Sequence, residues 1–124
     1  MSKRHGSNSK YWRNKADKEN TRLHRGKPCE ICGTTHQTCG HHVVERSISA
    51  YYRHDQRNMV DLCTTHHKFS NEIAPHSKNP LAVEAWLKWL RKNRQDANKI
   101  LSTYKLKTGA KIDYEQKFND LKGK

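Results

Sequence analysis

The sequence predicts a small α+β domain flanked by basic helices, and three observations support this prediction. The chain has 124 residues, which is the length of one domain with tails. The segment 41–45 contains two β-branched valines, and with 59–62 it forms a candidate pair of short strands. Helical spacing or helix-start residues recur elsewhere, at 10–25, 80–93, 95–107 and 114–122. Only 32% of the residues are hydrophobic, and a core this small usually needs additional cross-links.

The N-terminal third is expected to begin with disordered residues at 1–9 and to continue as a helix over 10–25. Gly26 and Pro28 are typical of the end of a helix. This helix has few apolar residues, so we expect it to be stabilised by docking on other parts of the protein or on a partner. A second helix is expected to begin at Cys63, directly after the second strand.

The C-terminal half contains two clear helix starts. Asn79 precedes Pro80, which suits an N-cap followed by the first helical position. Asp113 and Gln116 form a relaxed capping box for the helix at 114–122. We therefore divide the chain into a basic N-terminal arm (1–26), a central domain (27–93) and a basic C-terminal helical extension (94–124).

The net charge of +13 is concentrated in the two arms. Residues 1–28 hold nine Lys and Arg against two acids, and residues 77–124 hold twelve against five, whereas residues 29–76 hold four against five. Clusters of this kind bind phosphates by releasing counterions, which predicts a nucleic acid as a partner, with a membrane surface as the weaker candidate. The sequence has neither an apolar stretch that would span a membrane nor a signal peptide, so a cytoplasmic protein without a membrane partner is expected.

Two ligand pairs in the central domain predict a structural Zn²⁺ site. Cys29-x-x-Cys32 and Cys63-x-x-His66 each present two soft ligands on a tight turn, and together they make a Cys3His set. Disulfides are disfavoured in a chain without a signal peptide. Cys39 belongs to neither pair and is expected to be a small, partly buried hydrophobic residue. The alternative is that Cys39 replaces His66 as a zinc ligand.

A second set of residues predicts a separate site. His41 and His42 are neighbours on a strand, where adjacent side chains alternate, so we expect them to have different roles. His66 and His67 are separated by about 100° on a helix, so one can face the zinc and the other a second metal. Neutral His42 is suited to accept a proton near pH 7, and Asn58 is the candidate for support by hydrogen bonding.

The interleaved order Cys-Cys, His-His, Asn, Cys-His-His over residues 29–70 resembles the HNH endonucleases of the ββα-metal superfamily. The text CEIC, HHVVERS and RNMVDLCTTHH is most similar to small phage-type members with a structural zinc. The resemblance implies a ββα-metal core held together by the zinc knuckle pair. It also implies a metal-dependent DNA endonuclease of low sequence specificity, acting in a bacterial cell or a phage-infected host.

Carried over by position, His42 resembles the general base and Asn58 the residue that holds the base-bearing loop. His41 and His67 resemble the ligands of one catalytic divalent ion. His41 stands where many members have Asp, and two imidazoles suit Mn²⁺, Ni²⁺ or Zn²⁺ at least as well as Mg²⁺.

Several assignments are open in the sequence. Arg46 and Arg53 are candidates for DNA-phosphate binding, with ordinary exposed arginines as the equal alternative. His54 and His76 are expected to be polar surface residues, although His76 is also a candidate to assist a phosphate or metal. The sequence leaves open whether the protein acts with a partner protein or as a homodimer. One active site cuts one strand, so cleavage of both strands requires a dimer or two encounters.

Two other function classes compete with the nuclease. The first is a non-catalytic zinc-containing nucleic-acid-binding module, which would need the zinc ligands and not His42. The second is an interaction protein that would bind a partner through apolar residues of its C-terminal helices, namely Leu81, Trp86, Trp89 and Leu90. For the two tryptophans, packing in the core is favoured over stacking on bases.

Overall fold

The computed structural model describes residues 5–124, so the expected disorder of residues 1–4 lies outside the described part, and a turn at Gly6–Ser9 precedes the first helix. The α+β class is confirmed, because the described residues form helices and one two-stranded antiparallel sheet. The α-helices and strands are α1 (Lys10–His24), β1 (Thr38–His42), β2 (Met59–Cys63), α2 (Pro80–Asn93), α3 (Gln95–Thr103) and α4 (Tyr114–Lys122). Three short turns complete the described structure: η1 (Gln56–Asn58) and η3 (Tyr104–Lys107) are 3-10 turns, and η2 (Thr65–Phe69) is a π-helical turn.

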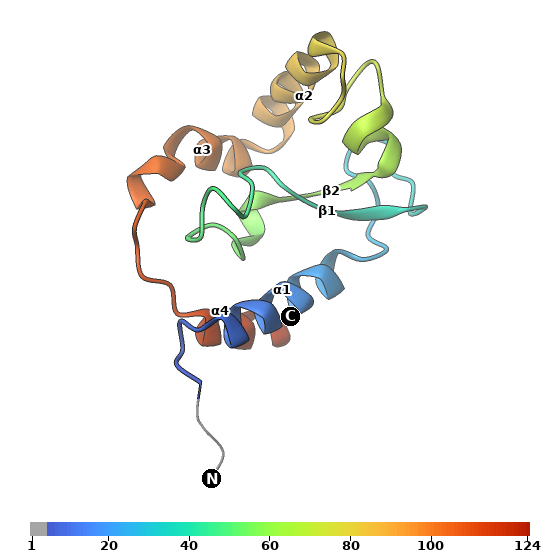
Figure 1. Cartoon of the computed structure of the whole chain (residues 1–124). Coiled ribbons are helices and arrows are strands. Elements are labelled where there is room, and N and C mark those ends of the chain that lie inside the picture. Colours follow the sequence, from blue (N-terminus) through green and yellow to red (C-terminus); the bar gives the residue numbers. More distant parts are fainter. Residues whose placement is uncertain (1–4) are drawn as a thin grey trace.

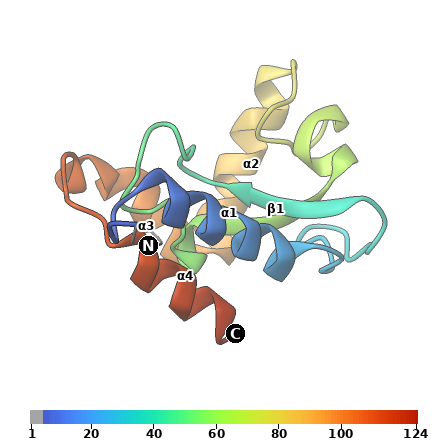
Figure 2. The ribbon, with the colours of Figure 1, turned by 60° about the horizontal axis from the view of Figure 1, so that its bottom comes forward.

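The sheet lies between two groups of helices. In Figure 1, α1 and α4 lie below β1 and β2, and α2 and α3 lie above them. Figure 2 shows α1 running along β1. The helix α1 therefore docks on the sheet and on α4, which supplies the support that its polar sequence requires.

The core joins the second strand to the helices that follow it. Its larger cluster contains residues of β2, α2 and α3, namely Val60, Leu62, Cys63, Trp86, Leu90 and Ala97, together with Cys29. A smaller cluster packs Val44 and Tyr52 against Ile100 of α3. Because Ala97 and Ile100 belong to these clusters, the core continues beyond residue 93.

The close approach of α1 to the sheet depends on Gly40. A Cβ built at this position would lie 2.8 Å from the Cβ of His24 and 2.7 Å from the Cε of Met59. Such contacts are too short for carbon atoms, so any larger residue would push α1 away from β1.

The first strand differs from the expectation of 41–45. β1 spans Thr38–His42 and pairs with β2 so that His42 lies opposite Met59 and Thr38 opposite Cys63. The backbone N–H of Val43 still donates to the carbonyl of Asn58, but the N–H of Val44 donates to the side-chain Oδ1 of Asn58, so the strand pairing ends before the valines.

The expected helix starts are confirmed in part. The side chain of Asn79 accepts a hydrogen bond from the N–H of Leu81 at the start of α2, and Asp113 accepts one from Gln116 at α4. The helix expected from Cys63 is shorter than predicted and amounts to the π-helical turn η2. The segment 95–107 divides into α3 and η3.

The apolar residues of α2 mostly face the core. Trp86 and Leu90 are 4% and 0% exposed, and Trp89 stacks on Trp86 with ring centroids 5.4 Å apart. Core packing of Trp86 is confirmed, whereas Leu81 is exposed. The four residues therefore do not form one free surface for a partner. No helix within residues 5–124 is long and apolar enough to cross a membrane.

Candidate metal centres and the residues around them

The four residues expected to bind zinc lie close together. Their ligand atoms, in Cys29, Cys32, Cys63 and His66, all lie within 4.8 Å of one another. The Sγ atoms of Cys32 and Cys63 are 3.7 Å apart, and the Nδ1 of His66 is 3.3 Å from the Sγ of Cys63. Two thiolates on a tetrahedral zinc ion are separated by about 3.8 Å, as follows from Zn–S bonds of about 2.3 Å. The geometry is thus compatible with a metal such as zinc.

All four cysteines of the chain are free thiols, so no disulfide competes for these sulfurs. Burial raises the pKa of Cys29, but backbone N–H groups of Cys32 and Cys63 outweigh it and lower that pKa. Burial and the neighbouring cysteine sulfurs raise the pKa of Cys63. The thiol of Cys63 is therefore hard to ionise beside that of Cys29. A cation bound between the two sulfurs would offset their repulsion and favour both thiolates.

Cys39 is exposed and lies outside the cluster, so the expectation of a partly buried residue was wrong. Strand alternation places Cys39 and His41 on the same face of β1, but only the His41 end of that face is covered, because the rings of His67 and Trp86 pack against His41. The alternative in which Cys39 replaces His66 finds no support in this geometry.

A second cluster contains three histidines. Ligand nitrogens of His41, His67 and His76 lie within 4.8 Å of one another. The ring centroids of His41 and His67 are 4.8 Å apart, and each is 5.0 Å from the centroid of His76. His66 and His67 therefore belong to different clusters, as their neighbouring positions on one turn suggested.

His76 was expected to be a surface residue, and it is exposed but joins this cluster. Its backbone N–H donates to the carbonyl of His67 at 3.1 Å, which brings the loop back onto η2. The loop is anchored by Ala74, which is fully buried and donates to the carbonyl of Ala82 in α2.

The histidine cluster favours neutral rings. Burial, reinforced by His67, His76 and His42, lowers the pKa of His41 to about 3. Burial also lowers the pKa of His67, with help from the charges of His76 and Lys68. Neutral imidazoles offer lone pairs to a cation, so this set fits a divalent transition metal. The ring of Trp86 packs against this cluster, with its centroid 5.9 Å from that of His41.

His42 lies next to this cluster with one nitrogen held in place. Its Nε2 is 2.9 Å from the backbone carbonyl of Arg53, which can only accept, so Nε2 carries the proton. Burial is the main cause that lowers the pKa of His42, and the charges of Arg46, His54 and Arg53 act in the same direction. In the neutral ring, Nδ1 is then the free proton acceptor.

Asn58 is fully buried and connects the two ends of the loop after β1. Its Nδ2 donates to the carbonyls of Val44 and Tyr52, and its Oδ1 accepts from the N–H of Val44. It thereby fixes the loop whose residue Arg53 holds His42.

The helix α1 also supports this loop, through a residue that the sequence analysis did not single out. Asp17 accepts two hydrogen bonds from the guanidinium of Arg53, at 2.9 and 2.6 Å, and binds the Nε2 of His54 at 2.7 Å. These partners outweigh burial and lower the pKa of Asp17. His54 was expected at the surface but is 4% exposed, because Asp17 offers it a buried partner. Arg53 is thus already paired within the protein.

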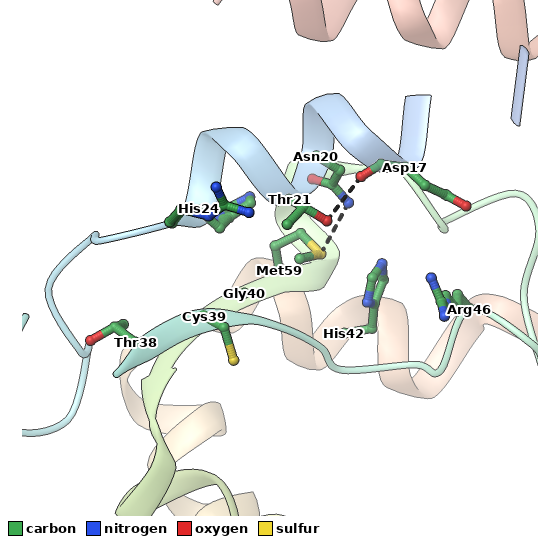
Figure 3. Close-up of a pocket in the computed structure, with 11 residues that line it drawn as sticks. Asp17, Asn20, Thr21, His24, Thr38, Cys39, Gly40, His42, Arg46 and Met59 are labelled. Atoms are coloured by element: carbon green, nitrogen blue, oxygen red, sulfur yellow. Dashed lines mark hydrogen bonds between the residues drawn. The ribbon is translucent and has the colours of Figure 1, made fainter. Parts of the chain in front are cut away.

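Figure 3 shows His42 pointing toward α1, with Arg46 beside it and Asp17 and Asn20 opposite. These residues line a cavity of about 370 Å³ between α1 and β1. His42 and Arg46 also line a cavity of about 350 Å³ on the side of the histidine cluster, which we call the histidine cavity. Arg46 is exposed, and within residues 5–124 it has no hydrogen bond or ion pair.

Comparison with protein-family models, curated proteins and solved structures finds no match to this chain.

Proposed function

We propose that this chain is a metal-dependent DNA endonuclease of the HNH type, with His42 as the general base and little sequence specificity. The observation that carries the proposal is that His42 lines the same cavity as three clustered imidazoles. Hydrolysis of a phosphodiester requires a base for water and positive charge near the phosphate. The excess of Lys and Arg supplies affinity for the DNA backbone.

The reaction follows from the orientation of His42. Its free Nδ1 takes a proton from water, the water oxygen forms a bond to phosphorus, and the bond between phosphorus and the 3′-oxygen breaks. The 3′-oxygen leaves as an alkoxide and takes a proton from solvent. The carbonyl of Arg53 keeps the proton on Nε2 and so keeps Nδ1 available. Asn58 acts as a positioning residue, because it holds the loop and does not line the histidine cavity.

We assign His41, His67 and His76 as ligands of the catalytic divalent ion. When bound, such an ion supplies Lewis-acid stabilisation of the negative charge on the phosphate and the leaving oxygen. We assign Cys29, Cys32, Cys63 and His66 to a structural zinc ion, in keeping with their separations.

The test is a plasmid-nicking assay on the zinc-loaded protein with Mg²⁺, Mn²⁺, Ni²⁺ or Zn²⁺ added in turn. We expect metal-dependent nicking that His42→Ala lowers by about 10²–10⁴-fold, the usual contribution of a general base. His36→Ala is the matched control, because His36 is exposed and belongs to neither cluster. Full activity in His42→Ala would show that the base is assigned wrongly. Tight DNA binding without cleavage by any metal would favour the non-catalytic zinc module.

A further inference from the structure

A further cavity of about 340 Å³ lies beside the histidine cavity, and both are lined by Arg46 and Ser47. Its walls come from α1, from the loop after β1 and from residues 104–114. The N-terminal and C-terminal arms therefore meet here, at the edge of the proposed active site. We call it the inter-arm cavity.

The charge of the inter-arm cavity is entirely positive. Arg13, Arg46, Arg53 and Lys107 line it, and no Asp or Glu does. Asp17 neutralises Arg53 from outside the cavity, at 2.6 Å, which leaves three cations without a carboxylate partner among residues 5–124. Three cations around one space repel one another, so an anion in that space would be stabilised.

An unsatisfied donor supports the same conclusion. The Nε of Arg13 is buried and has no hydrogen-bond partner among the described residues. A buried N–H without an acceptor costs free energy, and a shift of the Arg13 guanidinium toward an anion in the cavity that it lines would recover that cost. Lys107 has no carboxylate partner among residues 5–124, and its Nζ lies 5.2 Å from the ring centroid of Tyr51.

The volume of the inter-arm cavity and its aromatic side chains indicate which class of anion it would bind. Tyr51 and Tyr104 are half-buried and line the cavity. Lys107 and Lys117 already lie over the ring of Tyr51, so an aromatic base would pack on Tyr104. Cationic grooves with aromatic side chains are typical of sites that bind single nucleic-acid strands. A cavity of about 340 Å³ is in the range of small-ligand pockets and accommodates one nucleotide, whereas a duplex is too wide to enter it.

We propose that the inter-arm cavity binds one nucleotide of an unpaired DNA strand next to the phosphate that is cleaved, with the nucleotide phosphate held by Arg13, Arg46 and Lys107. The inference rests on the proposed function for the position of the cleaved phosphate. It specifies the substrate class of the proposed nuclease as DNA with an unpaired strand beside the cleavage site. Arg46 would then contact the strand between the two cavities.

The test compares two double variants that each remove two positive charges. Arg13→Gln with Lys107→Gln changes the inter-arm cavity, and Arg91→Gln with Lys92→Gln changes exposed residues of α2 that line neither cavity. Both are made in the His42→Ala background so that the DNA stays intact. The probe is a fluorescent oligothymidylate, and binding is followed by anisotropy over a range of salt concentrations.

We expect the cavity variant to bind at least about tenfold more weakly at 0.1 M salt, with a salt slope smaller by about 1.4, as the loss of two phosphate contacts to a single strand predicts. The α2 variant should change affinity less than about twofold. Equal losses of affinity in the two variants would overturn the proposal, because binding would then depend only on the net charge of the protein. Equal affinity for a blunt duplex, with the same loss in the cavity variant, would overturn the requirement for an unpaired strand.

A second measurement needs no substitution in the cavity. In amide NMR spectra of the His42→Ala protein, oligothymidylate should shift Gly109 and Ala110, which line the inter-arm cavity, more than Arg91 and Lys92. The reverse pattern would contradict the site. If the cavity variant alone loses affinity but the wild type does not cleave DNA, the nuclease proposal is wrong and the cavity proposal stands. If the wild type cleaves DNA but both variants lose affinity equally, the cavity proposal is wrong and the nuclease proposal stands.

Discussion

At the scale of single residues, His76 is the most informative position of the histidine cluster. It comes from an exposed loop, yet its ring is as close to His41 as it is to His67. In the proposed metal site, His76 would add a third imidazole to the pair of His41 and His67, and imidazoles suit divalent transition metals.

We therefore expect His76→Ala to weaken the binding of Ni²⁺ to the zinc-loaded protein by more than about tenfold, since even outer partners of metal ligands change affinity by about 10–100-fold. Isothermal titration of Ni²⁺ would measure this change. His36→Ala is the control and should bind Ni²⁺ like the wild type. An unchanged affinity in His76→Ala would remove His76 from the ligand set.

At the scale of elements, the end of α1 is tied to the second strand by His24. Its Nδ1 and Nε2 lie 2.6 Å from the carboxylate of Asp61 and 2.6 Å from the side-chain oxygen of Gln56. Both partner atoms are acceptors, so they favour the doubly protonated form of the ring, in which both nitrogens donate. Burial opposes this charge, but Asp61 outweighs burial and raises the pKa of His24.

A raised pKa in the folded state predicts how stability depends on pH. The contribution of His24 is fully present below its unfolded pKa of about 6.5 and is lost as the pH rises through the higher folded value. We expect Asp61→Asn to lower the free energy of unfolding below pH 6.5 and to flatten its fall at higher pH. Urea unfolding of the zinc-loaded protein between pH 5.5 and 8.5 measures both, with Glu84→Gln as an exposed control. Parallel pH curves for wild type and Asp61→Asn would contradict this role.

The helix α4 docks on α1, and its buried side includes Leu121, which is 2% exposed. We expect Leu121→Ala to reduce the free energy of unfolding by about 2–4 kcal/mol, the usual cost of removing a buried leucine. Leu106 is 83% exposed, and Leu106→Ala should change stability by less than about 0.5 kcal/mol. Denaturant unfolding would measure the two variants. Equal losses would mean that α4 is not packed as described.

At the scale of the whole molecule, the sheet has only two strands, and Cys29 and Cys63 form part of its main core cluster. Two of the four proposed zinc ligands are thus also core residues. We expect folding to depend on zinc, because binding of a structural ion is part of the folding free energy in small domains.

The prediction is that a chelator, or Cys29→Ser, abolishes cooperative thermal unfolding and removes zinc from the protein. Cys39→Ser is the matched control, because Cys39 is exposed and lies outside the cluster. Zinc content and circular dichroism would measure the outcome. A stable, zinc-free Cys29→Ser protein would show that the fold does not need the ion.

The parts that could be predicted from the sequence are local. The caps of α2 and α4 depend on residues two or three positions apart, and Asn79 and Asp113 make the expected hydrogen bonds. Each zinc knuckle also needs only four consecutive residues to orient two ligands. The end of β1 was predicted wrongly, because the side chain of Asn58, sixteen residues beyond His42, accepts the hydrogen bond of the Val44 N–H and so ends the strand pairing.

The sequence by itself determined the α+β class, the starts of α2 and α4 and the candidate ligand pairs, because short-range backbone geometry and side-chain chemistry are sufficient for these. The tertiary structure alone decided that His76 joins His41, that Asp17 binds Arg53 and His54, and that the arms meet in one cavity. Each of these contacts joins residues of different elements, and their approach depends on packing such as that of α1 on Gly40. Such packing is a property of the whole fold and has no counterpart in local sequence patterns.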